Sequence, residues 1–131
     1  MTRVFVLNHY PVLPITNGGQ QGVYGMVVQL ARQWPTELVW IQRKTRSTTV
    51  HTDGDTSLRI SIVPNLWRQR HLARLLSRWL GTIEGDIGTL LCSGANRALV
   101  DHLVHASADG DIFVLEHPWL WPALRAVLRR R

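Results

Sequence analysis

The chain has 131 residues, of which 45% are hydrophobic, and these values suit one domain with a buried core and exclude a disordered tail. Lys and Arg outnumber Asp and Glu by 15 to 9, and the resulting formal net charge of +6 favours partners that carry phosphates or carboxylates. The single cysteine, Cys92, excludes an internal disulfide, and we interpret it as a small core residue rather than a catalytic thiol.

The first third of the chain has the pattern of a parallel strand–helix–strand unit. The unbroken apolar run 4–7 predicts a strand that is covered on both faces, and a loop rich in Pro and Gly follows over 8–19. A helix comes next and ends at Pro35, and residues 37–42 predict a second strand. The apolar face of the helix is predicted from residues at helical spacing, namely Val23, Met26, Val27, Leu30, Ala31 and Trp34.

The middle of the chain predicts a β-hairpin and a helix. Residues 47–52 and 57–63 have strand character and are separated by the turn formers Asp53, Gly54 and Asp55. The helix is expected over 66–80, with arginines four residues apart on one face, namely Arg70, Arg74 and Arg78. Its buried stripe is predicted to consist of Leu72, Leu75, Leu76, Trp79 and Leu80.

The last third alternates between strand and helix again. Residues 87–92 predict a short strand, and Ser93 is expected to cap a helix that carries Leu99 and Leu103. A turn at 108–111 precedes a strand over 111–117 and a final helix with Pro118 or Pro122 in its first turn. The predicted fold is a single α/β domain over 1–131, a Rossmann-like three-layer α/β/α arrangement with a mainly parallel sheet.

The adjacent glycines Gly18 and Gly19 stand where the first strand hands over to the first helix. One interpretation is a turn that needs no Cβ, and the other is an anion site, because free N–H groups at a helix N-terminus favour negative charge. The spacing "GGQQGVYG" does not fit a dinucleotide-binding fingerprint, and a phosphate-binding P-loop is excluded because no Gly-Lys-Ser/Thr occurs.

These elements, together with the stretch "DIFVLEHPWLWPAL" over 111–124, resemble the start of a family 4-type glycosyltransferase. Such enzymes have the GT-B fold, two Rossmann-like halves that face each other across a cleft, and the resemblance spans most of the chain. It implies that Gly18, Gly19 and Gln20 approach the diphosphate of a nucleotide-sugar donor and that His117 lies near the transferred sugar as the catalytic residue. It also implies retention of anomeric configuration, with no metal and no cofactor apart from the donor substrate.

Other side chains near the ends of the predicted strands are weaker candidates. His9 follows the first strand as His117 follows the last one, so it is expected to line the cleft. Glu116 is an acid or the polar end of a strand, and we favour the polar end. Trp119 stacks on a sugar ring or packs in the fold. No metal site is predicted, because the pair of histidines at 102 and 105 lacks a third ligand.

The resemblance covers only an acceptor-side, N-terminal half, and the C-terminal, donor-binding half is absent from the sequence. We therefore expect little or no turnover from this chain alone, which is then a fragment, a truncated gene product, or one subunit of a split enzyme whose partner carries the donor half. The acceptor is a glycan, a lipid or a small molecule, and open sheet edges suggest a homodimer.

The alternative function is a non-catalytic basic module that binds an anionic polymer, a nucleic acid or a membrane surface, and a third hypothesis is a small α/β protein of another family. No apolar stretch approaches the roughly 20 residues of a membrane span, and no signal peptide is evident. The predicted location is the cytoplasm, with peripheral contact between the basic face and the inner face of an anionic membrane.

Overall fold

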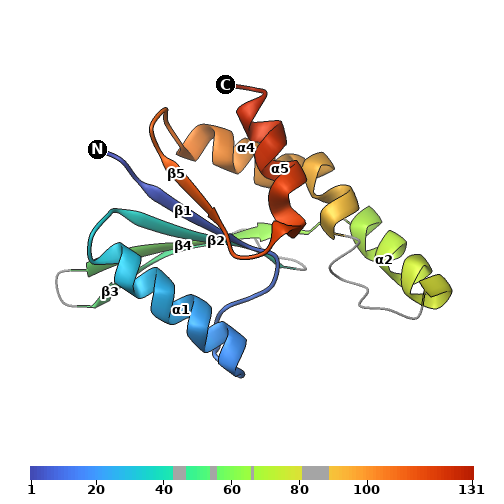
Figure 1. Cartoon of the computed structure of the whole chain (residues 1–131), viewed down its shortest axis with the longest axis horizontal. Coiled ribbons are helices and arrows are strands. Elements are labelled where there is room, and N and C mark those ends of the chain that lie inside the picture. The colour runs from blue at the N-terminus through green and yellow to red at the C-terminus, as the bar shows by residue number, and fades with distance from the viewer. Residues whose placement is uncertain (43–46, 54–55, 66, 81–88) are drawn as a thin grey trace.

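The computed structural model describes residues 1–42, 47–53, 56–65, 67–80 and 89–131, and a five-stranded sheet runs through its centre (Figure 1). The strands lie in the order β3-β4-β2-β1-β5. β4, β2, β1 and β5 are parallel, and β3 pairs antiparallel with β4 as the predicted hairpin. The strands are β1 (Val4–Asn8), β2 (Thr36–Gln42), β3 (Ser47–Asp53), β4 (Thr56–Pro64) and β5 (Ile112–Leu115).

Helices cover both faces of the sheet, which confirms the predicted three-layer α/β architecture. Helix α1 packs on one face, and α4 and α5 pack on the other (Figure 1). Helix α2 lies apart, beyond the end of the sheet. The helices are α1 (Gly18–Ala31), α2 (Trp67–Leu80), α4 (Arg97–Ala106) and α5 (Trp121–Leu128), with short 3-10 turns at Ser93–Ala95 and Pro118–Leu120.

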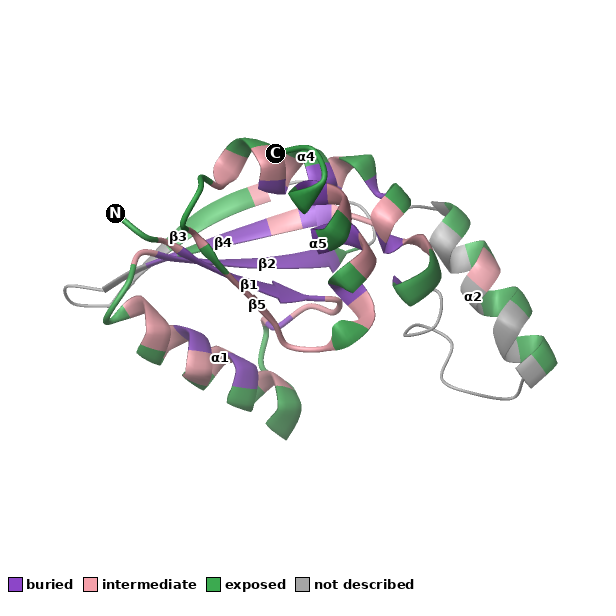
Figure 2. Cartoon of the chain, turned by 45° about the horizontal axis from the view of Figure 1, so that its top comes forward, coloured by how far each residue is buried: buried purple, intermediate pink, exposed green. Residues whose placement is uncertain are grey.

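The central strand β1 shows why the sheet is buried on both faces. Its side chains alternate, so that Val4 and Val6 pack toward α1 while Phe5 and Leu7 pack toward α4 and α5. All four are almost fully buried, which explains the unbroken apolar run in the sequence (Figure 2).

Three local predictions are wrong. Residues 89–92 are helical rather than part of a strand, whereas 87–88 lie outside the described residues. Ser93 begins a 3-10 turn, and Asn96 is the residue whose side chain caps α4, by accepting from the Leu99 N–H at 3.2 Å. Helix α1 ends at Ala31, so Trp34 lies beyond it and is 39% exposed instead of joining the buried face.

The predicted buried stripe of α2 is wrong at Leu75 and Trp79, whereas Leu72 is half-buried. Leu75 is 65% exposed and Trp79 is 85% exposed, because α2 projects from the body and has no sheet beneath it (Figure 2). The side chains of Arg70, Leu76 and Leu80 lie outside the description, as do the turn residues 54–55. Within the described part of the chain, no helix combines the length and apolarity that crossing a bilayer requires.

Candidate functional site

The carboxyl ends of β1 and β5 bring two predicted site residues together. The Glu116 N–H donates to the Leu7 carbonyl at 3.2 Å, which extends the β1–β5 ladder one residue past β5. This bond sets the residue after it, His117, beside the chain that leaves β1. His117 itself is extended (φ −134°, ψ 151°), as expected of a residue that precedes a proline.

His9, Tyr10 and His117 form a group of three rings at this edge of the sheet, which we call the ring cluster. The His9 and His117 ring centroids lie 5.3 Å apart, edge to face, and Tyr10 lies 4.9 Å from His9 and 6.1 Å from His117. Asn8 fixes the turn that carries Tyr10, since its side-chain Nδ2 donates to the Tyr10 carbonyl at 3.0 Å. The sequence pattern does not single out Tyr10, although it follows β1 only two residues after the strand ends.

The first turn of α1 faces the same edge. Gly18 and Gly19 are the first two residues of the helix, not the loop before it. A Cβ built on Gly19 would lie 3.8 Å from the Tyr10 hydroxyl, whereas one on Gly18 would meet nothing within 4 Å. The first turn contains no acidic residue, so its positive end is not neutralised. Within the described residues, the N–H groups of Gly18 and Gly19 donate to no protein acceptor.

Gln20, the third residue of the predicted phosphate-binding set, is engaged inside the loop. Its N–H donates to the Asn17 side chain at 2.9 Å, which caps the helix. Its side-chain oxygen accepts from the N–H and hydroxyl of Thr16 at 2.6 and 2.8 Å, and its Nε2 donates to the Pro11 carbonyl at 2.9 Å. Gln20 therefore holds the loop that presents the two glycines.

Glu116 and Trp119 flank the ring cluster along the chain. Glu116 is half-buried directly after β5, and Trp119 is half-buried in the turn before α5. The Trp119 carbonyl accepts from the Ser93 hydroxyl at 3.2 Å, which ties this turn to the segment before α4.

A basic groove of about 680 Å³, which the sequence did not predict, opens beside the carboxyl end of β4. Arg68 of α2, Arg97 at the start of α4 and Arg130 after α5 belong to its lining, and the Arg130 guanidinium also donates to the Asp101 carboxylate at 2.7 Å. Asn96 also lines the groove, and its Nδ2 donates to the Pro64 carbonyl at 3.1 Å. We call this feature the arginine groove. Its three cations come from three elements, so no local motif marks it in the sequence.

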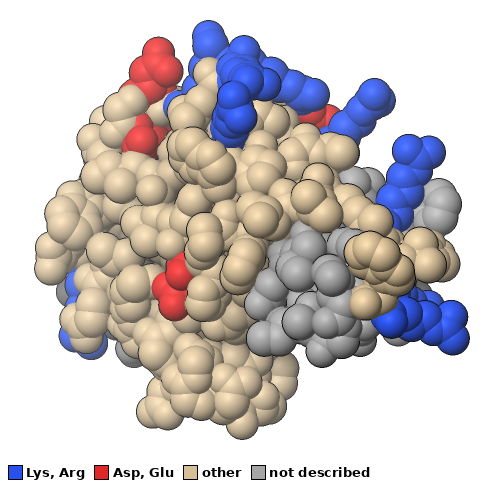
Figure 3. Space-filling model, turned by 45° about the vertical axis from the view of Figure 1, so that its right-hand side comes forward, with Lys and Arg blue, Asp and Glu red and all other residues tan. Residues whose placement is uncertain are grey.

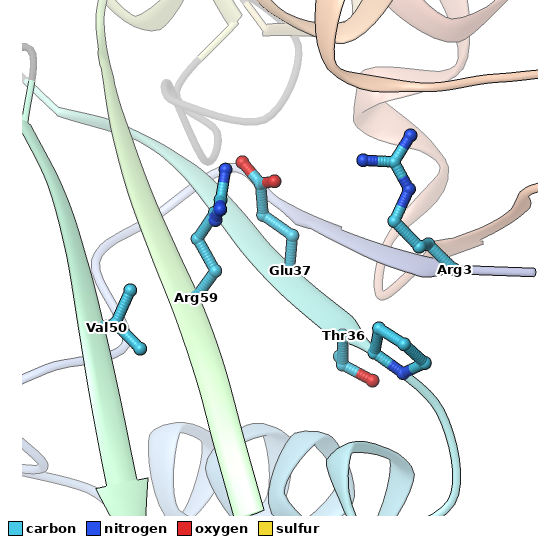
Figure 4. A pocket seen from close by; sticks show the side chains of 6 residues that line it. Arg3, Thr36, Glu37, Val50 and Arg59 are labelled. Carbon is cyan, nitrogen blue, oxygen red and sulfur yellow. The ribbon is translucent and has the colours of Figure 1, made fainter. Parts of the chain in front are cut away.

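A second cavity, of about 160 Å³, lies near the amino-terminal ends of the strands and is lined by Arg3, Glu37 and Arg59 (Figure 4). The Glu37 carboxylate accepts from the Ser61 hydroxyl at 2.6 Å and lies 2.8 Å from His102 Nε2. Burial alone would raise the pKa of Glu37, but the hydrogen bonds from His102 and Ser61 and the charges of His102 and Arg59 lower it. This network is separate from the ring cluster.

The described part of the chain contains neither a cluster of metal-binding side chains nor a cysteine with a lowered pKa. None of its His, Cys, Asp or Glu residues gather in a group of three or more that could bind a metal ion. Burial raises the pKa of the Cys92 thiol, so it stays protonated at neutral pH.

Comparison with known proteins gives matches in structure but not in sequence. No protein-family model matches the chain, and no curated protein is similar to it in sequence. A trehalose-6-phosphate synthase from E. coli bound with UDP-2-fluoro glucose superposes on 98% of the chain with a TM-score of 0.61 and 14% identity. The α,α-trehalose-phosphate synthases (UDP-forming) from Burkholderia vietnamiensis and, in complex with glucose-6-phosphate, from Burkholderia xenovorans each cover 99% of it with a TM-score of 0.57 and 14% identity.

The fold is that of part of a GT-B glycosyltransferase. The predicted GT-B resemblance and fold class are thereby confirmed. The chain spans only about 30% of the length of these enzymes. At 14% identity the comparison establishes the fold, and the roles of individual residues remain predictions.

Proposed function

We propose that this chain is the acceptor-side part of a glycosyltransferase, which moves a sugar from a nucleotide-sugar donor to an acceptor with retention of anomeric configuration. One observation carries the proposal. The ring cluster brings the carboxyl ends of β1 and β5 together, and Gly19 at the start of α1 lies close to Tyr10 of that cluster. Ligands of open α/β sheets bind beyond the carboxyl ends of the strands. A fold neighbour bound with UDP-2-fluoro glucose supports a nucleotide-sugar as the ligand.

In this proposal the donor diphosphate lies against the first turn of α1. The N–H groups of Gly18 and Gly19 donate to its oxygens, and the absence of a Cβ lets the phosphate approach the backbone. Gln20 contributes by fixing the loop, since its own N–H and side chain already have partners.

His117 is proposed to hydrogen-bond a hydroxyl of the transferred sugar. An imidazole can donate from one ring nitrogen and accept at the other, so it can orient a hydroxyl in either role. The edge-to-face contact with His9 limits rotation of the His117 ring. Glu116 and Trp119 line the same side of the cleft.

The arginine groove is proposed to take the acceptor, as a sugar or lipid that carries a phosphate. One guanidinium group can donate to two phosphate oxygens at once. Arg97 stands at the N-terminus of α4, and a helix N-terminus also favours an anion. A fold neighbour in complex with glucose-6-phosphate supports this class of acceptor. Turnover further requires a second Rossmann-like half, from a partner chain or a longer protein, because the reacting sugar needs groups on both sides.

Donor binding is tested by titrating the 15N-labelled chain with UDP-glucose and following amide chemical shifts. We expect saturable shifts at Gly18, Gly19, Tyr10 and His117. Gly18→Val should abolish them, because its side chain would project into space that is open in the free chain. Gly22→Val is the matched control, since Gly22 lies one turn later in α1 and also faces open space.

Two results would contradict donor binding at this site. One is the absence of saturable shifts at the first turn of α1 and the ring cluster. The other is an equal response of the Gly18→Val and Gly22→Val variants. If shifts occur only at arginines and vanish as salt rises, the alternative function of a basic anion-binding module is favoured instead.

A further inference from the structure

Helix α2 presents an apolar stripe to solvent. Leu72, Leu75 and Trp79 are three and four residues apart, so they lie on one face of the helix, on which Leu72 is half-buried. Leu75 is 65% and Trp79 is 85% exposed, although apolar side chains of this size usually pack against a second element. Figure 1 shows the reason, since α2 extends away from the sheet and its helices.

The face beside this stripe is basic. Arg74 and Arg78 are one turn apart, and both are exposed. The sequence of α2 contains four arginines and no acidic residue. In Figure 3, basic side chains project from the side of the molecule where α2 lies, and no acidic side chain among those described is drawn beside them.

This combination selects among the partners that could cover the helix. A second copy of the chain is disfavoured, because two such helices in contact would bring their arginines together. A nucleic acid would use the arginines but has no place for a leucine next to them. A bilayer with anionic headgroups satisfies both faces, because its acyl chains accept Leu and Trp while its phosphates accept Arg.

We propose that α2 docks this protein on an anionic membrane surface. Leu75 and Trp79 enter the boundary between headgroups and acyl chains, and Arg74 and Arg78 contact lipid phosphates. The helix axis lies in the plane of the surface, as in other interfacial helices. Membrane docking through α2 does not depend on glycosyl transfer, so an experiment can contradict one of these two proposals and leave the other unchanged.

Vesicle flotation tests the charged face. The whole chain should bind vesicles that mix phosphatidylcholine with anionic phosphatidylglycerol, should not bind phosphatidylcholine alone, and should dissociate as salt rises. The double variant Arg74→Glu/Arg78→Glu should lower binding by about tenfold or more. The control Arg32→Glu/Arg125→Glu makes the same change in net charge on α1–β2 and α5 surfaces and should bind as the original chain does.

A second pair of variants tests the apolar face. Leu75→Ser/Trp79→Ser should lower vesicle binding several-fold, whereas Trp121→Ser/Leu128→Ser, which removes two exposed apolar side chains of α5, should not. Thermal unfolding by circular dichroism shows whether each variant is folded. Brominated acyl chains should also quench tryptophan fluorescence of the original chain, and Trp79→Phe should remove most of that quenching.

Three outcomes would overturn membrane docking. The first is equal binding to neutral and anionic vesicles, or vesicle binding that neither of the two α2 double variants lowers. The second is the absence of vesicle binding together with tight, salt-dependent binding of single-stranded RNA, which would assign the arginines to nucleic acid. The third is concentration-dependent self-association in analytical ultracentrifugation that Leu75→Ser/Trp79→Ser abolishes while vesicles remain unbound.

Discussion

Glu37 is an acidic residue in the interior whose charge is balanced by its neighbours. It lies on β2, with only 8% of its side chain exposed, between His102 of α4 and Ser61 of β4. The carboxylate therefore links two strands to the helix above them. Its pKa is below the ordinary value of 4.5, so the folded state binds its proton less tightly than the unfolded chain does.

Acid should remove the stability that Glu37 contributes. A lowered folded pKa means that this contribution is present above the unfolded pKa and disappears as the pH falls through the folded pKa. We expect the free energy of unfolding in urea to decline below about pH 4.5, and Glu37→Gln to flatten that decline while costing about 1.5–3 kcal/mol at neutral pH. The exposed Asp109→Asn serves as a control and should keep the original pH profile. An unchanged profile in Glu37→Gln would contradict the assigned network.

Two glycines should respond to alanine in opposite ways. A Cβ on Gly94 would lie 3.1 Å from the Pro122 carbonyl oxygen and 3.3 Å from its carbon, so Gly94→Ala must push the 3-10 turn away from α5. A Cβ on Gly25, inside α1, would meet nothing within 4 Å. We expect Gly94→Ala to destabilise by about 1–3 kcal/mol and Gly25→Ala to stabilise by about 0.5–1 kcal/mol, measured by urea unfolding. The same sign for both variants would contradict the packing at Gly94.

At the scale of elements, the start of α1 depends on one side chain. Asn17 accepts from the Gln20 N–H, and Gln20 reaches back to Thr16, so each end of this small motif supports the other. Asn17→Ala should cost about 1 kcal/mol of stability and speed hydrogen exchange at the Gln20 N–H. Asn17→Asp retains an acceptor and should restore the protection. If alanine and aspartate behave alike, the cap contributes nothing.

The sequence predicted the elements of the sheet well because their signals are local. The apolar runs of β1 and β2, the turn formers between β3 and β4, and Pro122 in the first turn of α5 each indicate an element without reference to the rest of the chain. The short apolar run ending at Cys92 was mistaken for a strand, since a run of that length fits a helix equally well. Helical spacing grouped Leu75 with Trp79 correctly but could not show that both side chains are exposed.

The sequence predicts the candidate site only for residues whose positions follow from the order of the strands in the sheet. Carboxyl ends of neighbouring parallel strands must meet, so the proximity of His9 and His117 follows once β1 and β5 are paired. Tyr10 carries no such signal, because its place depends on the turn that Asn8 fixes. The arginine groove combines arginines from α2, from the start of α4 and from the segment after α5, and no pattern in the sequence brings these three together.

At the scale of the whole molecule, the described sheet has two unlike edges. β3 is the edge on one side and is rich in Thr, whereas β5 on the other side reads Ile-Phe-Val-Leu and is only partly buried. Unpaired N–H and carbonyl groups along an apolar edge strand can pair with another strand. The predicted homodimer should therefore form through β5 rather than β3.

Lysine substitutions on β5 and on β3 distinguish a homodimer that forms through β5 from one that forms through β3. Ile112 on β5 is 48% exposed and Val50 on β3 is 59% exposed, so both positions tolerate a charge. Edge lysines oppose strand pairing between copies, because they place like charges side by side. Sedimentation velocity should show self-association of the original chain that Ile112→Lys suppresses and Val50→Lys leaves intact. Equal suppression by both variants would indicate that net charge, and not the β5 edge, controls association, and suppression by Val50→Lys alone would place the contact at β3.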